Sequence, residues 1–176
     1  MNWRAIGIAL AIALLLGGGA VAVVKLSSNE KTRLEAMHPD AKVALQGLIA
    51  ELAEMGVRTF VGSTRRTKAE AEKLKAEGKA SANLKSDWHT IGRAVDLYVY
   101  HEGKVDFNGK NLDHIKTMHS VAKKRGWRGI AFKEDGSKWM INSVKGPIWD
   151  AGHLEWRGGK DFAVAEIESR KLGLVS

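Results

Sequence analysis

The stretch SDWHTIGRAVDLYV combines an imidazole and a carboxylate at a spacing that suits metal binding. His89 precedes Asp96 by seven residues, and the small residues Gly92 and Ala94 lie between them. A buried aspartate needs a hydrogen-bond donor or a metal ion as its partner. If the chain turns at Gly92 and then enters a strand, the side chains of His89 and Asp96 can converge. We therefore regard this pair as candidate metal ligands.

A second stretch, WDAGHLEW, offers a further imidazole between two carboxylates. Asp150 precedes His153 by three residues, and Glu155 follows it by two. Two histidines and one carboxylate are a common ligand set for catalytic zinc, which keeps its fourth position for water. Another carboxylate beside such a site can accept a proton from that water. The two stretches together point to metal-assisted hydrolysis.

The remaining histidines carry no comparable signal. They do not form the HExxH pattern of helix-borne zinc sites, and we expect them at the surface or partly buried: His38, His101, His114 and His119. The chain contains no cysteine, so it forms no disulfide and offers no thiolate ligand. Any metal ion must then be held by His, Asp or Glu.

Read together, the two stretches resemble a family of zinc peptidases that act on bacterial cell-wall peptides. The motif HxxGxAxD is matched in full from His89 to Asp96, and an acidic-xxHxE motif is matched from Asp150 to Glu155. The family contains D-alanyl-D-alanine carboxypeptidases and the L-alanyl-D-glutamate endopeptidases found as phage endolysins. The resemblance covers about residues 36–160, and GWRG at 126–129 is similar to a Gly-Trp found between the motifs in endolysins.

The resemblance implies a role for each matched residue. It implies that zinc is held by His89, Asp96 and His153, and that Asp150 activates the water. An arginine upstream of the first motif faces the substrate carbonyl in the family, and the spacing to Leu74 and Gly78 selects Arg66 rather than Arg65. Where the family commonly has serine two residues before the first histidine, this chain has Asp87. The role of Glu155 stays open.

Helical and strand patterns alternate irregularly along the chain, which favours an α+β fold. We expect helices over 38–57, 68–80, 112–126 and 161–174. Strands are expected over 57–64 and from Gly92, with a turn at Glu102-Gly103, and short strands and loops over 127–159. The resemblance implies a small mixed sheet with flanking helices, as in the D-Ala-D-Ala peptidases and the hedgehog signalling domain.

The N-terminal region predicts a membrane segment. Residues 5–24 form an uncharged run of 20 residues between Arg4 and Lys25, about the length that crosses a bilayer. We expect a tail over 1–4, a transmembrane or signal-anchor segment over 5–24, a linker over 25–35 and a zinc peptidase domain over 36–176. The domain is then exported and anchored to the inner membrane. Cleavage near GGGAVA is the alternative, and the Gly- and Ala-rich composition also suits a signal-arrest-release segment that leaves the bilayer.

The formal net charge of +8 favours anionic partners, such as the polyanionic cell wall. We expect a monomer that binds peptidoglycan stem peptides, with Zn²⁺ as cofactor and no nucleic-acid partner. The favoured activity is an L-Ala-D-Glu endopeptidase that lyses the host as an endolysin. A D-Ala-D-Ala carboxypeptidase of the envelope and a non-catalytic zinc-containing wall-binding domain are the alternatives.

Overall fold

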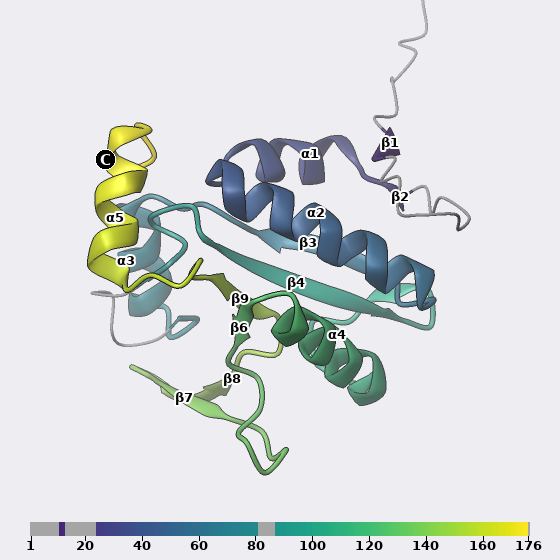
Figure 1. Ribbon diagram of the computed structural model, residues 1–176. Coiled ribbons are helices and arrows are strands. Elements are labelled where there is room, and N and C mark those ends of the chain that lie inside the picture. Colours follow the sequence, from purple (N-terminus) through teal and green to yellow (C-terminus); the bar gives the residue numbers. More distant parts are fainter. Residues whose placement is uncertain (1–10, 13–23, 81–86, 176) are drawn as a thin grey trace, which may run out of the picture.

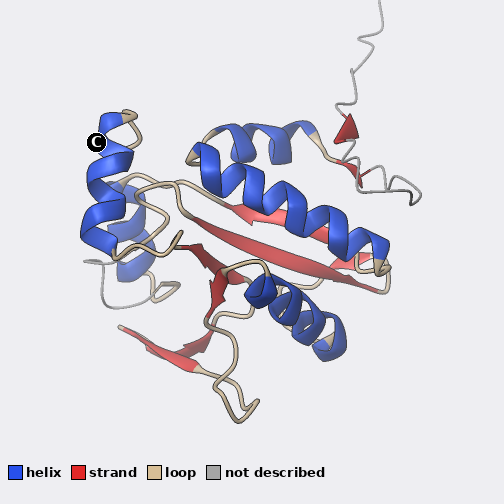
Figure 2. Cartoon of the chain, viewed as in Figure 1, coloured by secondary structure: helices blue, strands red, loops and turns tan. Residues whose placement is uncertain are grey.

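The computed structural model describes residues 11–12, 24–80 and 87–175 (Figure 1). The helices are α1 (Ser28–Glu35), α2 (Pro39–Glu54), α3 (Lys68–Ala76), α4 (Leu112–Lys124) and α5 (Phe162–Lys171). The strands are β1 (Ala11–Ile12), β2 (Val24–Lys25), β3 (Thr59–Ser63), β4 (Ala94–His101), β5 (Lys104–Val105), β6 (Trp127–Gly129), β7 (Met140–Ser143), β8 (Gly146–Trp149) and β9 (His153–Trp156). Helices and strands are mixed along the chain, so the expected α+β class is confirmed (Figure 2).

The central sheet has the strand order β3-β4-β9-β6, and β5 pairs with β4. Every strand pair in the described residues is antiparallel, so the expectation of a mixed sheet is wrong. The reason lies in the connection between β3 and β4. Ser63 at the end of β3 pairs with Asp96 near the start of β4, so the chain returns from the end at which it left. A parallel pair needs a crossover connection instead.

The side chains of strand β4 alternate between the core and the face of the sheet that carries the candidate site. Val95, Leu97 and Val99 are buried in the main core, whereas Asp96 and Tyr98 are half-buried on the opposite face. Successive side chains of a strand point to opposite faces of its sheet. The core face packs against α2 and α4, which run alongside β4 in Figure 1. The other face of the sheet is therefore free of these helices and can hold a site.

A smaller cluster fixes the loop that precedes β4. Trp88 and Ile91 of this loop are buried with Ala165 of α5, and the Trp88 ring meets Phe162 edge-to-face with centroids 5.4 Å apart. Gly92 has a φ of +71°, a backbone conformation that glycine adopts without strain. His89 directly follows Trp88 on the same loop. Helix α5 thus holds a candidate ligand in position although it contributes no residue to the site.

Residues 28–35 form helix α1, where the sequence predicted part of a linker over 25–35. The helix begins with a capping box in which Ser27 and Glu30 exchange hydrogen bonds. Glu30 also accepts the backbone N–H of Val61 at 3.0 Å, and Arg33 donates to the Val61 carbonyl at 2.6 Å. Helix α1 therefore covers the open edge of β3. Because these contacts are polar, the apolar pattern of the sequence did not indicate this helix.

Most of the predicted membrane segment over residues 5–24 lies outside the described residues. Its described residues are Ala11, Ile12 and Val24, and strand β1 (Ala11–Ile12) pairs with strand β2 (Val24–Lys25). Within the part of the chain that the structure describes, no helix is both long enough and apolar enough to span a bilayer.

Glu30→Ala tests the docking of α1. The change removes the capping box and leaves the buried Val61 N–H without its acceptor, so we expect the free energy of unfolding to fall by about 2–3 kcal/mol. Urea denaturation measures this. Glu35→Ala is the control, because Glu35 is exposed and pairs with Lys42 at the surface; it should cost less than about 1 kcal/mol. Equal losses would contradict the assignment of Glu30.

Candidate active site

A cleft of about 840 Å³ opens on the sheet face opposite α2 and α4. Its floor is formed by residues of β3, β4 and β9, and one wall by the β7–β8 hairpin. It is lined by Ser63, Arg66, Leu74, Lys79, Ala80, Asp87, Trp88, His89, Asp96, Tyr98, Arg128, Ile130, Trp139, Ile141, Ile148, Trp149, Asp150, His153 and Glu155. The volume is within the usual range for ligand sites.

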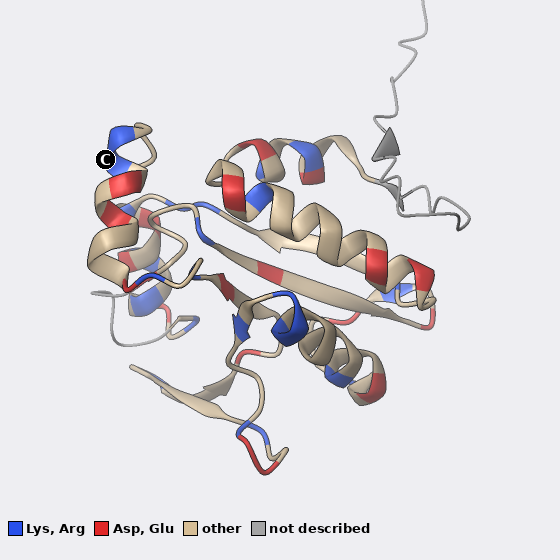
Figure 3. Cartoon of the chain, in the orientation of Figure 1, with Lys and Arg blue, Asp and Glu red and all other residues tan. Residues whose placement is uncertain are grey.

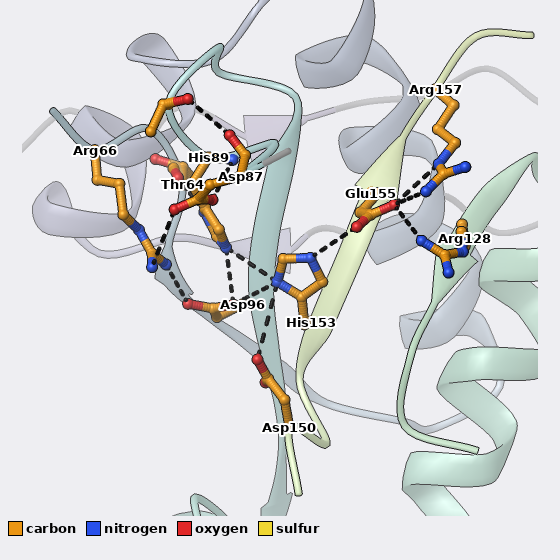
Figure 4. Close-up of polar contacts among 11 residues, drawn as sticks. Thr64, Arg66, Asp87, His89, Asp96, Arg128, Asp150, His153, Glu155 and Arg157 are labelled. Atoms are coloured by element: carbon orange, nitrogen blue, oxygen red, sulfur yellow. Dashed lines mark hydrogen bonds and ion pairs between the residues drawn. The ribbon is translucent and has the colours of Figure 1, made fainter. Parts of the chain in front are cut away.

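At the floor of this cleft, two imidazole nitrogens and one carboxylate oxygen form a small triangle (Figure 4). His89 Nε2 lies 3.1 Å from Asp96 Oδ1 and 3.2 Å from His153 Nδ1, and His153 Nδ1 lies 3.4 Å from Asp96 Oδ1. Ligands at 2.0–2.1 Å from a tetrahedral zinc ion are separated by about 3.3 Å. The triangle thus has the dimensions of one face of such a coordination sphere, and these three residues could hold a metal ion.

The pairing of two strands brings His153 to Asp96. The register of β4 and β9 sets Asp96 directly opposite His153, and residues opposite each other in a sheet project from the same face. His89 joins them from the loop before β4. Asp87 Oδ1 accepts the backbone N–H of His89 at 3.0 Å. The aspartate that departs from the family's serine therefore supports the loop.

The outer nitrogen of each histidine has an acceptor that leaves the inner nitrogen free for a metal ion. His89 Nδ1 contacts the carbonyl of Thr64, and His153 Nε2 lies 3.5 Å from Glu155 Oε1. An acceptor at one ring nitrogen keeps the proton there and presents the lone pair of the other. This arrangement supplies the role of Glu155 that the sequence left open.

The charges of the site stabilise a positive charge at its centre. Burial opposes protonation of His153, but the carboxylates of Asp96 and Glu155 outweigh it and raise the pKa of this imidazole to about 10. Burial likewise opposes ionisation of Asp96, yet His89 and His153 hold the pKa of its carboxyl well below the usual value. A divalent cation matches this environment, because buried charges need partners of the opposite sign.

Asp150 lies beside the triangle and is not one of its corners. Its Oδ2 is 4.0 Å from His153 Nδ1. Burial and the nearby negative charge of Asp96 raise the pKa of the Asp150 carboxyl. A carboxyl group with a raised pKa can accept and return a proton near neutral pH. Asp150 is thus in a position to act as a base next to a bound cation.

Arg66 also reaches the site, but its closest partner is a protein carboxylate. Its Nη2 donates to Asp96 Oδ2 at 3.1 Å and to Ser63 Oγ at 3.4 Å, and only 11% of its side chain is exposed. The sequence predicted that Arg66 faces the substrate carbonyl. Arg66 lies in the cleft lining beside Asp96, and its contact with a substrate carbonyl stays a prediction.

His119 was expected to be an ordinary helix residue, and the structure gives it a defined contact near Asp150. Its Nε2 donates from α4 to the carbonyl of Ala151 at 2.8 Å. A Cβ at Gly129 would overlap the His119 ring. Gly129 ends the GWRG stretch, so the need for a glycine there was the signal that could have located this contact. His38, in contrast, caps α2 and lies away from the cleft lining.

No protein-family model matches the chain, and no curated protein matches it in sequence. Several solved structures are similar to it, and two peptidases are among them. The L-Ala D-Glu endopeptidase ChiX of Serratia marcescens is 15% identical, with a TM-score of 0.55 over 80% of this chain and 92% of that one. The vancomycin resistance D,D-pentapeptidase VanY in complex with Zn(II) is 14% identical, with a TM-score of 0.50 over 76% of this chain and 78% of that one. The chain therefore has the fold of these peptidoglycan peptidases, as the resemblance implied.

Zinc binding by the triangle can be measured without an activity assay. The full chain is purified in detergent and freed of metal with a chelator, which is then removed. We expect it to bind one Zn²⁺ per molecule and to gain thermal stability on binding, because a ligand that prefers the folded state stabilises it. His153→Ala removes one corner and should abolish tight binding. Asp150→Asn leaves all three corners and should bind zinc within about tenfold of the unchanged protein. Full zinc content in His153→Ala would contradict the assignment.

Proposed function

We propose that the chain is a zinc-dependent peptidase that hydrolyses a peptide bond in the stem peptides of peptidoglycan. The observation that carries the proposal is the triangle of His89, Asp96 and His153, with edges of 3.1–3.4 Å and a fourth carboxylate, Asp150, beside it. This constellation lies in a cleft of about 840 Å³, on the fold of ChiX and VanY. Fold likeness alone would not support an activity.

His89 Nε2, Asp96 Oδ1 and His153 Nδ1 are the atoms that would hold the zinc ion. Zinc in such a site supplies Lewis-acid polarisation of a carbonyl and lowers the pKa of water. The protein contributes the orientation of these atoms, through Thr64 behind His89 and Glu155 behind His153. Partners behind metal ligands commonly change metal affinity by about 10–100-fold when they are lost.

Asp150 is the general base and then the general acid in this proposal. Its carboxylate accepts a proton from the attacking water and returns it to the nitrogen of the leaving amine. The carbonyl carbon first bonds to the water oxygen, which places negative charge on the carbonyl oxygen. The bond from that carbon to nitrogen then breaks as the nitrogen takes the proton from Asp150, so each cleaved peptide bond consumes one water. The raised pKa of Asp150 supports both transfers. A non-catalytic wall-binding domain would have no use for this carboxylate.

Arg66 contributes positive charge close to the reacting carbonyl. With one N–H on Asp96, the guanidinium neutralises a ligand carboxylate and still lines the cleft. Fixed charge aimed at a developing oxyanion is one of the larger contributions to catalysis. We propose that the remaining N–H groups of Arg66 face that oxygen, as the resemblance to the family implies.

Among the bonds of a stem peptide, we favour the one between L-alanine and D-glutamate, with lysis of the host wall as the biological role. The acidic residue before His153 is aspartate, as in the endolysins that the sequence resembles, and the likeness to ChiX covers 92% of that chain. The likeness to VanY supports a second candidate, removal of a terminal D-alanine. The two candidates differ only in the bond that is cut.

The domain would act outside the cytoplasm while tethered by residues 5–24 to the inner membrane. This proposal rests on the uncharged run of 20 residues and on the length needed to cross a bilayer. The net positive charge of the chain supports attraction to the polyanionic wall. Because helix α1 begins at Ser28, we propose that the folded domain begins at Ser27 and not at residue 36.

Three hydrogen bonds from separate elements fix the backbone around Asp150. Trp149 Nε1 donates to the carbonyl of Ala131 at 2.7 Å, His119 donates to the carbonyl of Ala151, and the Leu97 N–H donates to the carbonyl of Gly152 at 2.9 Å. A base that is displaced by 1 Å can lose about two orders of magnitude in rate. These contacts are therefore part of the proposed mechanism.

Digestion of purified peptidoglycan by the zinc-loaded full chain tests the proposal. Mass spectrometry should detect fragments with a new N-terminal D-glutamate, whereas loss of a terminal D-alanine would favour the second candidate. Asp150→Asn should lower kcat by about 10²–10⁴-fold, because it removes the base, while zinc stays bound. If neither fragment is released, the proposed function is rejected. If Asp150→Asn keeps substantial turnover, the assignment of Asp150 as the base is rejected.

Replacement of His119 tests the positioning of Asp150. His119→Leu removes the donor to Ala151 and should lower kcat by roughly tenfold, which corresponds to about 1.4 kcal/mol, with little change in KM. His119→Gln keeps an N–H donor and should recover most of the loss. Steady-state kinetics on a synthetic stem peptide separates kcat from KM. Identical rates for the leucine and glutamine variants would contradict a positioning role.

A further inference from the structure

One wall of the cleft carries an arginine that the proposed mechanism does not use. Arg128 lies on β6 directly opposite Glu155 of β9, and β6 bears a basic band in Figure 3. Its Nη1 donates to Glu155 Oε2 at 3.0 Å. The side chain is 41% exposed and lines the cleft. The guanidinium therefore faces solvent in the space where a substrate would lie.

Glu155 does not need Arg128 for its own neutralisation. Arg157 donates to Glu155 Oε2 through Nε at 3.0 Å and through Nη2 at 2.7 Å, and His153 faces the other carboxylate oxygen. Arg157 is absent from the cleft lining. The carboxylate of Glu155 thus contacts two arginines, and Arg128 is the one that lines the cleft.

Most donors of Arg128 have no partner among residues 24–80 and 87–175. A guanidinium has five N–H groups, and Arg128 uses one of them on protein among residues 24–80 and 87–175. The indole of Trp139 lies with its ring centroid 5.9 Å from the guanidinium carbon. A ring near the guanidinium leaves the in-plane N–H groups available. In-plane pairs of N–H groups match the two oxygens of a carboxylate.

The other cations of the cleft are less suited to this task. Arg66 is largely buried and bonded to Asp96. Lys79 is exposed and pairs with Glu77 at 2.8 Å, and an ammonium group cannot form the two parallel bonds of a guanidinium. Of the cations lining the described part of the cleft, Arg128 combines exposure with a free planar edge.

We propose that Arg128 binds a carboxylate of the substrate and selects stem peptides with a free carboxylate close to the cleaved bond. This inference rests on the proposed function. Arg128 contacts Glu155, which in turn faces His153 on the side away from the metal triangle (Figure 4). Glu155 and His153 thus stand between Arg128 and the other corners of the triangle, so Arg128 would meet the substrate beside the cleaved bond and not at it. Two carboxylates of a stem peptide meet this condition: the α-carboxylate of D-glutamate, which is linked through its γ-carboxyl, and that of the third residue.

Synthetic peptides that differ only in acid and amide groups test the inference. The first pair carries D-glutamate or its α-amide, and the second pair carries the third residue as its acid or its amide. For the unchanged full chain in detergent, loaded with zinc, we expect kcat/KM to be at least tenfold higher for the acid of one pair. Arg128→Gln should reduce this acid-to-amide ratio to near one.

Arg157→Gln is the matched control, because it also removes a cation from Glu155 but does not alter the cleft lining. Its acid-to-amide ratio should equal that of the unchanged chain, whatever happens to its overall rate. Arg128→Lys keeps the charge without the planar edge, so its ratio should be intermediate, and this variant serves if Arg128→Gln fails to fold. Affinities measured by calorimetry on the Asp150→Asn background should follow the same order without any hydrolysis.

The outcomes separate the inference from the function on which it rests. If the unchanged chain cleaves none of the four peptides, the proposed function fails. If it cleaves acid and amide equally in both pairs, or if the ratio survives in Arg128→Gln, the carboxylate contact is overturned. A collapse confined to one pair supports the contact and identifies which of the two carboxylates Arg128 binds.

Discussion

Two imidazole nitrogens and one carboxylate oxygen lie within 3.4 Å of one another, and the surrounding elements hold these three atoms in place. Three electron-rich atoms so close together, in a place largely shielded from water, are unfavourable unless a proton or a cation lies between them. The register of β4 and β9 supplies two of the atoms. The loop pinned by α5 supplies the third. Residues far apart in the sequence thus share one electrostatic requirement.

Charge is arranged in layers around this centre. Behind each histidine stands an acceptor, Thr64 for His89 and Glu155 for His153. Behind Glu155 stand Arg128 and Arg157. Negative charge next to the centre and positive charge beyond it keep the carboxylates ionised without withdrawing them from the imidazoles. The cleft consequently changes from acidic at its floor to basic along one wall.

The sequence predicted the residues of the triangle. Residue types and spacing made His89, Asp96 and His153 candidates, because each histidine is near a carboxylate, and the resemblance to the zinc peptidases implied that these three are the ligands. Apolar periodicity identified α2 and α4, which bury their stripes in the core. Helix α1 escaped prediction, since Glu30 and Arg33 anchor it through polar bonds to Val61. His119 escaped as well, because its partner Ala151 is 32 residues away and no local pattern encodes that contact.

With residues 5–24 as the proposed membrane anchor, the early start of the fold would limit how far the domain can reach. A linker over 25–35 would give the domain about 35–40 Å of slack from a bilayer, but only residues 25–27 precede α1, about 10 Å of chain. The backbone carbonyl of Arg33 in that helix accepts a hydrogen bond from the Thr64 hydroxyl, and the Thr64 carbonyl contacts His89 Nδ1. An anchored molecule would therefore reach only the peptidoglycan next to the membrane. Release of its N-terminal segment from the bilayer would then determine which layers of the wall the domain can reach.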